Sequence, residues 1–88
     1  PQAPVHVLII PKGPYVSFDH FSAAASADEI VDFTRAIAAV CQQMEVDLPR
    51  GGGFRAISNA GVDGVQEVPH LHLHILGGRG LGQMLSAV

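Results

Sequence analysis

The chain has 88 residues and a net charge of −3, enough length for one small domain with a single core but no basic surface for nucleic acid. Hydrophobic residues make up 48% of the chain and charged residues 15%, and this apolar surplus favours a buried oligomer interface. The single cysteine excludes an internal disulfide, and no stretch resembles a signal peptide or an apolar membrane span of about 20 residues. We therefore expect a soluble, cytoplasmic protein that binds neither nucleic acid nor membranes.

The first predicted element is a strand over residues 5–10, VHVLII, with one histidine, His6, inside it. The turn cluster PKGP at 11–14 closes this strand. An extended piece, YVSF at 15–18, and a small-residue connection, FSAAAS at 21–26, are expected to follow. Because the motif PQAP leads directly into the first strand, we interpret the chain as one domain, 1–88, that lacks a preceding segment.

A long amphipathic helix is predicted to begin after Ser26 and to end near Val46. The motif SADE fits a capping box, in which the Ser26 hydroxyl accepts from the amide of Glu29 and the Glu29 carboxylate accepts from the amide of Ser26. Apolar residues recur at the spacing of one helix face, at Ile30, Phe33, Ile37, Val40, Cys41 and Met44. On this face we expect Cys41 to be a small buried hydrophobe.

Two more strands are predicted, FRAIS at 54–58 and VPHLHLHIL at 68–76, separated by the polar loop NAGVDGVQ. Pro69 must lie at the start or on an edge of the last strand, because it cannot donate to a ladder. The order strand, helix, strand, strand predicts an α+β fold. We expect an antiparallel sheet with one main helix packed on one face.

The last predicted strand carries histidine at every second position. Side chains alternate between the two faces of a strand, so His70, His72 and His74 are expected on one face and the intervening leucines on the other. An imidazole can donate and accept protons near neutral pH. The row of histidines is therefore the first place to look for function.

Four interpretations of this row are open from the residues alone. The histidines could be the solvent-facing side of an amphipathic strand. Two of them could bind zinc with His6 or Asp63, since three same-face positions span about 13 Å, too far for a single ion. A histidine could serve as general base, although no serine or cysteine lies in a recognisable nucleophile motif. Finally, an imidazole could itself attack phosphorus, with Asn59 and Gln66 of the preceding loop as donors to the phosphoryl oxygens; this interpretation accounts for most of the features together.

The motif HLHLHIL at 70–76 resembles the His-φ-His-φ-His-φ-φ signature (φ apolar) of the histidine triad family, and the following GGR is similar to its nucleotide-binding (Hint) branch. The stretches PQAPVHVLIIPK and NAGVDGVQEVPHLHLHILGGR are similar to bacterial members of that branch. The similarity runs over nearly the whole chain. It implies the histidine triad fold, with a sheet that continues across a homodimer.

The resemblance also implies an activity, the hydrolysis of purine nucleoside phosphoramidates to an amine and a nucleoside monophosphate, with no cofactor or metal required. By this analogy His72 is the nucleophile that forms a covalent nucleotidyl intermediate, and His74 assists proton transfer at the leaving group. His70 would orient the site, and His6 would buttress it. Taken alone, His6 could equally be a core histidine bonded to a carbonyl.

The phosphate-contacting loop of the family corresponds to Asn59, Gln66, Glu67 and Val68. Asn59 could equally be a turn residue that ends a strand. Glu67 replaces a serine found in many relatives, and Pro69 replaces an aromatic residue and removes a backbone donor. The segment that precedes PQAP in the family carries much of the nucleoside pocket. The alternative function is a non-catalytic purine nucleotide-binding or protein-interaction module on the same fold.

Overall fold

The structure is a computed structural model that describes residues 3–84, so the first two residues of the PQAP motif lie outside the described part. Its elements follow in the order β1 (Val5–Ile9), α1 (Phe18–Ala24), α2 (Ala27–Gln43), β2 (Phe54–Ser58) and β3 (Leu73–Gly77). Over this part of the chain, neither helix combines the length and the apolar character that crossing a membrane would require.

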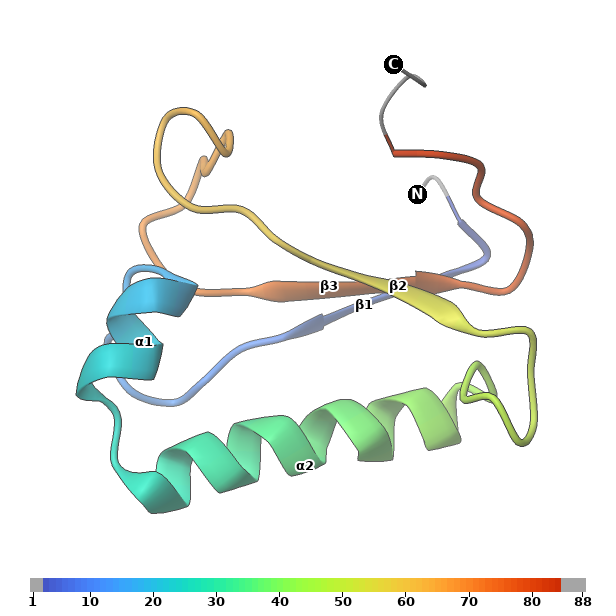
Figure 1. The fold of residues 1–88 in the computed structure, drawn as a ribbon, viewed down its shortest axis with the longest axis horizontal. Coiled ribbons are helices and arrows are strands. Elements are labelled where there is room, and N and C mark those ends of the chain that lie inside the picture. Colours follow the sequence, from blue (N-terminus) through green and yellow to red (C-terminus); the bar gives the residue numbers. More distant parts are fainter. Residues whose placement is uncertain (1–2, 85–88) are drawn as a thin grey trace.

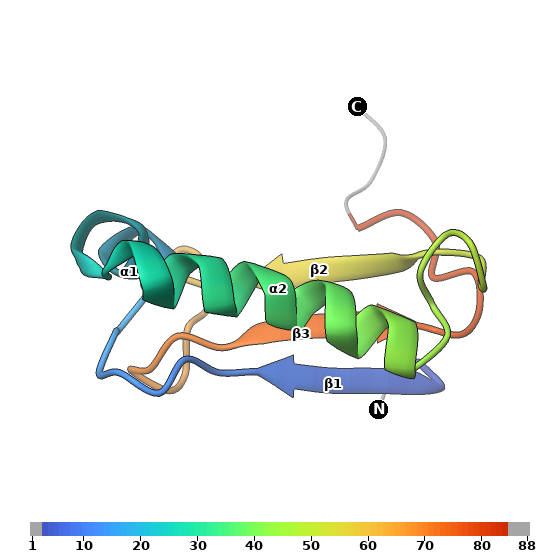
Figure 2. The ribbon, with the colours of Figure 1, turned by 90° about the horizontal axis from the view of Figure 1, so that it is seen from below.

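The three strands form one antiparallel sheet in the order β1-β3-β2, with β3 at its centre (Figure 1). The helix α2 crosses one face of this sheet, as the view from below shows (Figure 2). His74 in β3 pairs with Leu8 on one side and with Ile57 on the other. The predicted α+β fold, with one main helix on an antiparallel sheet, is confirmed.

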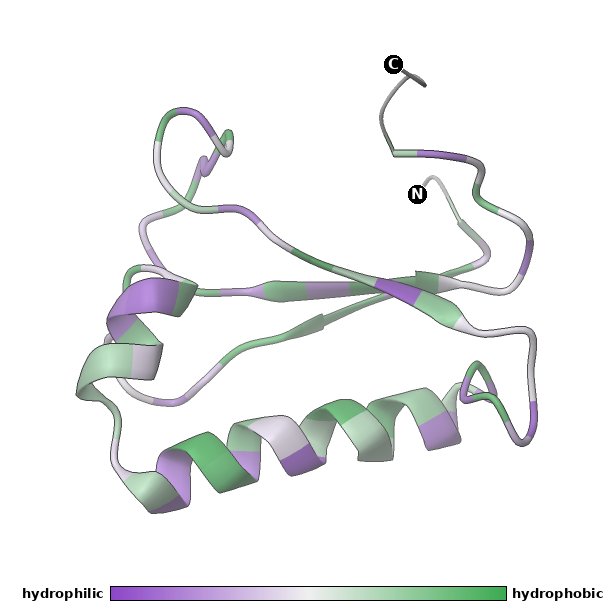
Figure 3. Cartoon of the chain, viewed as in Figure 1, coloured by the Kyte–Doolittle hydropathy of each residue, from purple (hydrophilic) through white to green (hydrophobic). Residues whose placement is uncertain are grey.

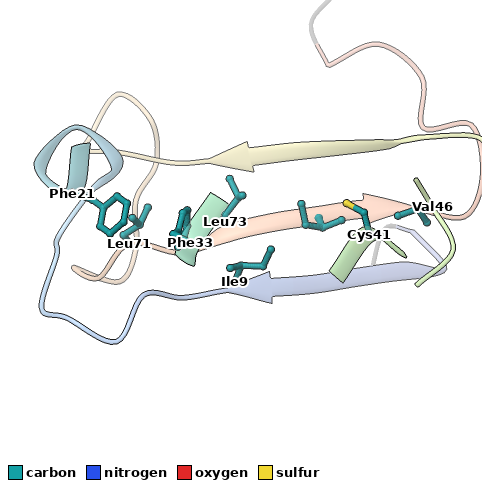
Figure 4. Close-up of a cluster of buried hydrophobic side chains, with 8 residues drawn as sticks. Ile9, Phe21, Phe33, Cys41, Val46, Leu71 and Leu73 are labelled. Carbon is teal, nitrogen blue, oxygen red and sulfur yellow. The ribbon is translucent and has the colours of Figure 1, made fainter. Parts of the chain in front are cut away.

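The core lies between the sheet and α2. Alternate residues of the histidine stretch supply its centre, with Leu71, Leu73 and Ile75 at most 4% exposed. The helix contributes Phe33 and Cys41, so the prediction that Cys41 is buried is confirmed (Figure 4). In Figure 3 a hydrophilic stretch interrupts the apolar residues of β3, in keeping with the one histidine, His74, within that strand.

The start of α2 follows the sequence prediction. The backbone N–H of Glu29 donates to the Ser26 hydroxyl at 3.2 Å, and the N–H of Ser26 donates to the Glu29 carboxylate at 3.0 Å. This reciprocal pair is the predicted capping box. It satisfies two backbone donors that the first helical turn leaves without intrahelical partners.

The end of α2 comes earlier than predicted, at Gln43 rather than near Val46. Glu45 has a left-handed backbone with φ 57°, which stops the helix. The N–H of Val46 then donates to the carbonyl of Cys41, and the N–H of Glu45 donates to that of Gln42. These two bonds form a Schellman motif, and the buried Val46 packs into the core directly after the turn.

The expected connection at 21–26 is wrong for most of its length, because Phe18–Ala24 forms the short helix α1. This helix is stabilised by contacts with distant parts of the chain and not by a local sequence pattern. Phe21 is only 2% exposed, and the centre of its ring lies 5.0 Å from the ring centres of Tyr15 and Phe33. A helix of this length is unstable alone, so the burial of Phe21 is what holds it.

The last strand is shorter than predicted at its start. β3 begins at Leu73, so His70 and His72 precede it. The neighbouring strands end opposite that point, at Ile9 and Ser58, and offer no further ladder partners. The N–H of Leu71 donates instead to the carbonyl of Tyr15 at 2.8 Å, which keeps this stretch extended.

Candidate active site

Histidines and core residues alternate from residue 70 onward, although only His74 of the three lies within β3. His70, His72 and His74 are half-buried on one side, while the leucines between them are buried on the other. In Figure 1 the described helices lie below the sheet or beyond its end, and none covers its upper face. The predicted row of histidines therefore lies on the open face of the sheet.

Two hydrogen bonds fix the first two rings. The Nδ1 of His72 lies 2.9 Å from the carbonyl oxygen of His70, and the Nε2 of His70 lies 3.1 Å from the carbonyl oxygen of Gly13. A carbonyl can only accept, so both nitrogens carry a proton in these bonds. A neutral His72 held in this way has its unprotonated nitrogen at Nε2.

His6 of β1 joins the third histidine. Its Nε2 lies 2.9 Å from Nδ1 of His74, so one of these nitrogens donates and the other accepts. The His74 ring centre is 5.2 Å from that of His6 and 5.0 Å from that of His72. Burial, and then the charges that His72 and His6 can carry, lower the pKa of His74 below its ordinary value and favour its neutral form.

Residues of both neighbouring strands lie beside the histidine stretch. Leu8 pairs with His74 across β1 and is 49% exposed, whereas Ile10, just past the strand, lines the cavity on the α2 side of the sheet. On the other side Ser58 pairs with Leu73, and Asn59 follows directly after the end of β2. The histidines thus lie between an exposed apolar edge and a polar loop.

The loop after β2 is held by side-chain bonds to its own backbone. The Nδ2 of Asn59 donates to the carbonyl of Gly64 at 2.6 Å, and Gln66 bonds within the loop as well. Glu67 and Val68 are exposed, and their backbone N–H groups donate to no residue of the described part. These two amides are free donors directly before the histidines.

The metal-binding arrangement with two triad histidines and His6 or Asp63 is not assembled. Among residues 3–84, no group of three or more histidine, cysteine, aspartate and glutamate side chains is placed to hold an ion. The two larger cavities, of about 310 and 390 Å³, are both lined by α2 on the opposite side of the sheet from the histidines. The fourth predicted histidine, His6, is instead brought directly to His74.

No feature of the sequence indicates the role of Gly13. Its carbonyl accepts from His70, and a Cβ at this position would lie 2.6 Å from the ring of Tyr15. The turn residues PKGP predicted a bend there, but a backbone acceptor leaves no side-chain signature. His20, which matched no catalytic position, is exposed on α1 and lies outside the cluster.

The fold and the site define a small α+β protein with an imidazole cluster on the open face of its sheet. The chain belongs to the HIT domain family, whose model matches residues 1–81. It is 49% identical over 86 residues to an uncharacterized 13.2 kDa HIT-like protein of Azospirillum brasilense, covering 98% of this chain and 68% of that protein. It is also 40% identical to an uncharacterized HIT-like protein of Rickettsia prowazekii, over 92% of this chain and 65% of the relative. The chain thus spans about two thirds of the length of these relatives.

Solved structures give the same result. A histidine triad protein from Clostridium difficile has a TM-score of 0.79 and 36% identity, over 97% of this chain and 70% of that one. A HIT family hydrolase from Clostridium thermocellum has a TM-score of 0.79 and 37% identity, over 97% and 71%. A HIT family hydrolase from Legionella pneumophila follows at 0.75 and 31%, over 96% and 71%. The chain therefore shares the fold of HIT family hydrolases.

Proposed function

We propose that the protein hydrolyses the P–N bond of purine nucleoside phosphoramidates, as the resemblance to the Hint branch implies. His72 is the nucleophile, and the products are an amine and a nucleoside monophosphate. No metal or other cofactor takes part. The cytoplasm is the proposed location, in keeping with a nucleotide substrate.

The observation that carries this proposal is the hydrogen bond from Nδ1 of His72 to the carbonyl of His70, 2.9 Å long. It fixes the ring in the tautomer whose Nε2 lone pair is free. That lone pair lies on the open face of the sheet, where a substrate can approach. A neutral imidazole with a free nitrogen is a good nucleophile toward phosphorus.

The reaction proceeds in two displacements. Nε2 of His72 bonds to the α-phosphorus and the P–N bond to the amine breaks, with a proton passing to the amine from the histidine cluster. Water then attacks the same phosphorus, the bond to His72 breaks, and the monophosphate leaves. His74, which bonds to His6 and whose ring centre lies 5.0 Å from that of His72, is the proposed partner for proton transfer at the leaving group.

The phosphoryl oxygens gain negative charge in both steps. Asn59, directly after β2, and the free amides of Glu67 and Val68 are the proposed donors to these oxygens. Each well-placed donor of this kind contributes about 3 to 4 kcal/mol to the transition state. The exposed Leu8, which pairs with His74, provides apolar surface beside the histidines for the nucleoside.

Trapping the intermediate tests the nucleophile. Under single-turnover conditions with an adenosine phosphoramidate, acid quench and peptide mass spectrometry should find adenylate attached to His72. His72→Ala should keep the fold and lose turnover by about 10³-fold or more, as expected when a covalent nucleophile is removed. Wild-type turnover in His72→Ala would contradict the assignment.

The same experiment separates catalysis from binding alone. A non-catalytic nucleotide-binding module would bind AMP at equilibrium but release no amine in a single turnover. A metal-dependent reaction would lose activity in the presence of a chelator, whereas the proposed mechanism predicts no change.

We further propose that the protein is a homodimer whose sheet continues through β2. This strand has β3 on one side only, and its other edge is open among the described residues. Beside it, Leu48 is 78% exposed and Phe54 is 44% exposed. Both line an apolar cavity of about 390 Å³ that extends to Ile37 and Ala38 of α2. An edge strand next to an apolar helix face suits a self-complementary two-fold contact.

A further inference from the structure

The side-chain amide of Gln66 is fully used inside the protein. Its Nε2 donates to the carbonyl oxygens of Val16 and Val68, and its Oε1 accepts from the N–H of Gly61 at 3.1 Å. An amide has two N–H donors, and both are engaged here. A phosphate offers only acceptors, so Gln66 has no donor left for it. This arrangement does not fit the role of phosphate ligand that the family resemblance implies.

The carbonyl of Val16 belongs to a segment that also holds the histidines. We call residues 13–16 the strap. The carbonyl of Gly13 accepts from Nε2 of His70 at 3.1 Å, and the carbonyl of Tyr15 accepts from the N–H of Leu71 at 2.8 Å. The strap therefore fixes the start of the histidine stretch.

The strap is itself anchored to α2. The hydroxyl of Tyr15 lies 2.9 and 2.8 Å from the two carboxylate oxygens of Glu29. The same carboxylate accepts from the N–H of Ser26 in the capping box. The position of the strap is thus tied to the most regular element of the fold.

We propose that Gln66 is a positioning residue, which sets the free amides of Glu67 and Val68 at a fixed place relative to His72. Two connections lead from the strap to the site. One passes through His70, whose carbonyl orients the His72 ring, and the other passes through Gln66 to Val68. The nucleophile and the phosphate donors are therefore aligned against one common segment. This inference rests on the proposed function, because it takes those amides as phosphate donors.

The test compares Gln66→Met with Gln43→Met. Methionine keeps the length of glutamine but cannot donate and accepts only weakly. Gln43 is the exposed last residue of α2 and gives a matched control away from the site. Thermal unfolding checks that both variants fold.

Two measurements are made on each protein. Amide hydrogen exchange tests whether Gln66 holds the loop, and ligand binding tests whether the loop serves the phosphate. Amide hydrogen exchange without ligand should be faster at Gly61 in Gln66→Met than in the wild type, because its side-chain acceptor is lost. The Kd for AMP should rise roughly tenfold, the scale of one weakened hydrogen bond to a charged group, while the Kd for adenosine stays within about twofold. Gln43→Met should match the wild type in both.

Three results would overturn the positioning role. Wild-type AMP affinity in Gln66→Met, despite faster exchange at Gly61, would mean that the loop does not serve the phosphate. Weaker AMP binding with unchanged exchange would mean that Gln66 contacts the ligand directly. Equal losses for AMP and adenosine would indicate a general structural role. If the wild-type protein itself bound no AMP, the proposed function would fall, and faster exchange at Gly61 in Gln66→Met would still show separately that Gln66 holds the loop.

Discussion

His74 is the histidine whose protonation the structure opposes. Burial is the largest cause, followed by the charges available to His72 and His6, and together they lower its pKa in the folded state. The unfolded chain takes up this proton near pH 6.5, whereas the folded protein takes it up only at lower pH. The stability associated with His74 is therefore fully present above about pH 6.5 and is lost as the pH falls through the folded pKa.

We predict that His74→Gln weakens the dependence of the free energy of unfolding on pH. Between about pH 6.5 and the folded pKa, the free energy of unfolding of the wild type should fall more steeply with acid than that of the variant. Urea unfolding at a series of pH values measures both slopes. Parallel curves for His74→Gln and the wild type would remove His74 as the cause.

The sequence predicts which histidines share a side of the chain, but it does not predict the hydrogen bonds that they make. Alternation alone placed His70, His72 and His74 on one side, because a strand covered on one face imposes it. The contact from His6 to His74 depends on strand order, which the sequence pattern does not specify. The bond from His70 to the carbonyl of Gly13 involves a backbone group and could not be read from any side chain.

At the scale of the elements, the residue that ends α2 has a backbone conformation that its side chain disfavours. Glu45 adopts φ 57° directly after the helix, a conformation that costs an L-residue about 1–2 kcal/mol and glycine little. Part of this gain is offset by the greater flexibility of glycine in the unfolded chain. Glu45→Gly should therefore stabilise the protein by about 1 kcal/mol or slightly less.

The control for this prediction is Glu45→Ala. Alanine removes the same carboxylate but suffers the same left-handed strain, so it should give no comparable gain. Chemical denaturation of both variants measures the difference. If alanine stabilised as much as glycine, the effect would come from the charge and not from the backbone.

The start of α2 can be predicted from nearby residues, whereas its end cannot. Ser26 and Glu29 determine the start, because the capping box needs only groups within four residues. The end carries no glycine or proline at the position where the helix stops, so the apolar spacing extends the prediction to Val46. That residue is buried for another reason, since it packs back onto the core after the turn. The short helix α1 was not predicted for a similar reason. It depends on the contacts of Phe21 with Tyr15 and Phe33, which the local sequence does not reveal.

At the scale of the whole molecule, the apolar surplus of the sequence lies partly on the surface. Exposed apolar side chains occur on both sides of the sheet, with Leu8 beside the histidines and Leu48 and Phe54 in the cavity that α2 lines. We propose Leu8 as the apolar contact of the nucleoside. Leu48 and Phe54 lie on the opposite side of the sheet from the histidines, and we propose that they contact the second copy instead.

The dimer predicts a specific response to charge. Leu48 is 78% exposed in the single chain, so Leu48→Glu should change the stability of a monomer by no more than about 0.5 kcal/mol. In a dimer that buries this position, the unpaired carboxylate would be costly, and sedimentation should show a shift from the dimer to the monomer mass. Val62→Glu adds the same charge at a side chain that is 93% exposed on the loop after β2, at the other end of that strand, and should leave the mass unchanged. A wild-type protein that sediments as a monomer, or a Leu48→Glu variant that remains dimeric, would rule out a two-fold contact through this face.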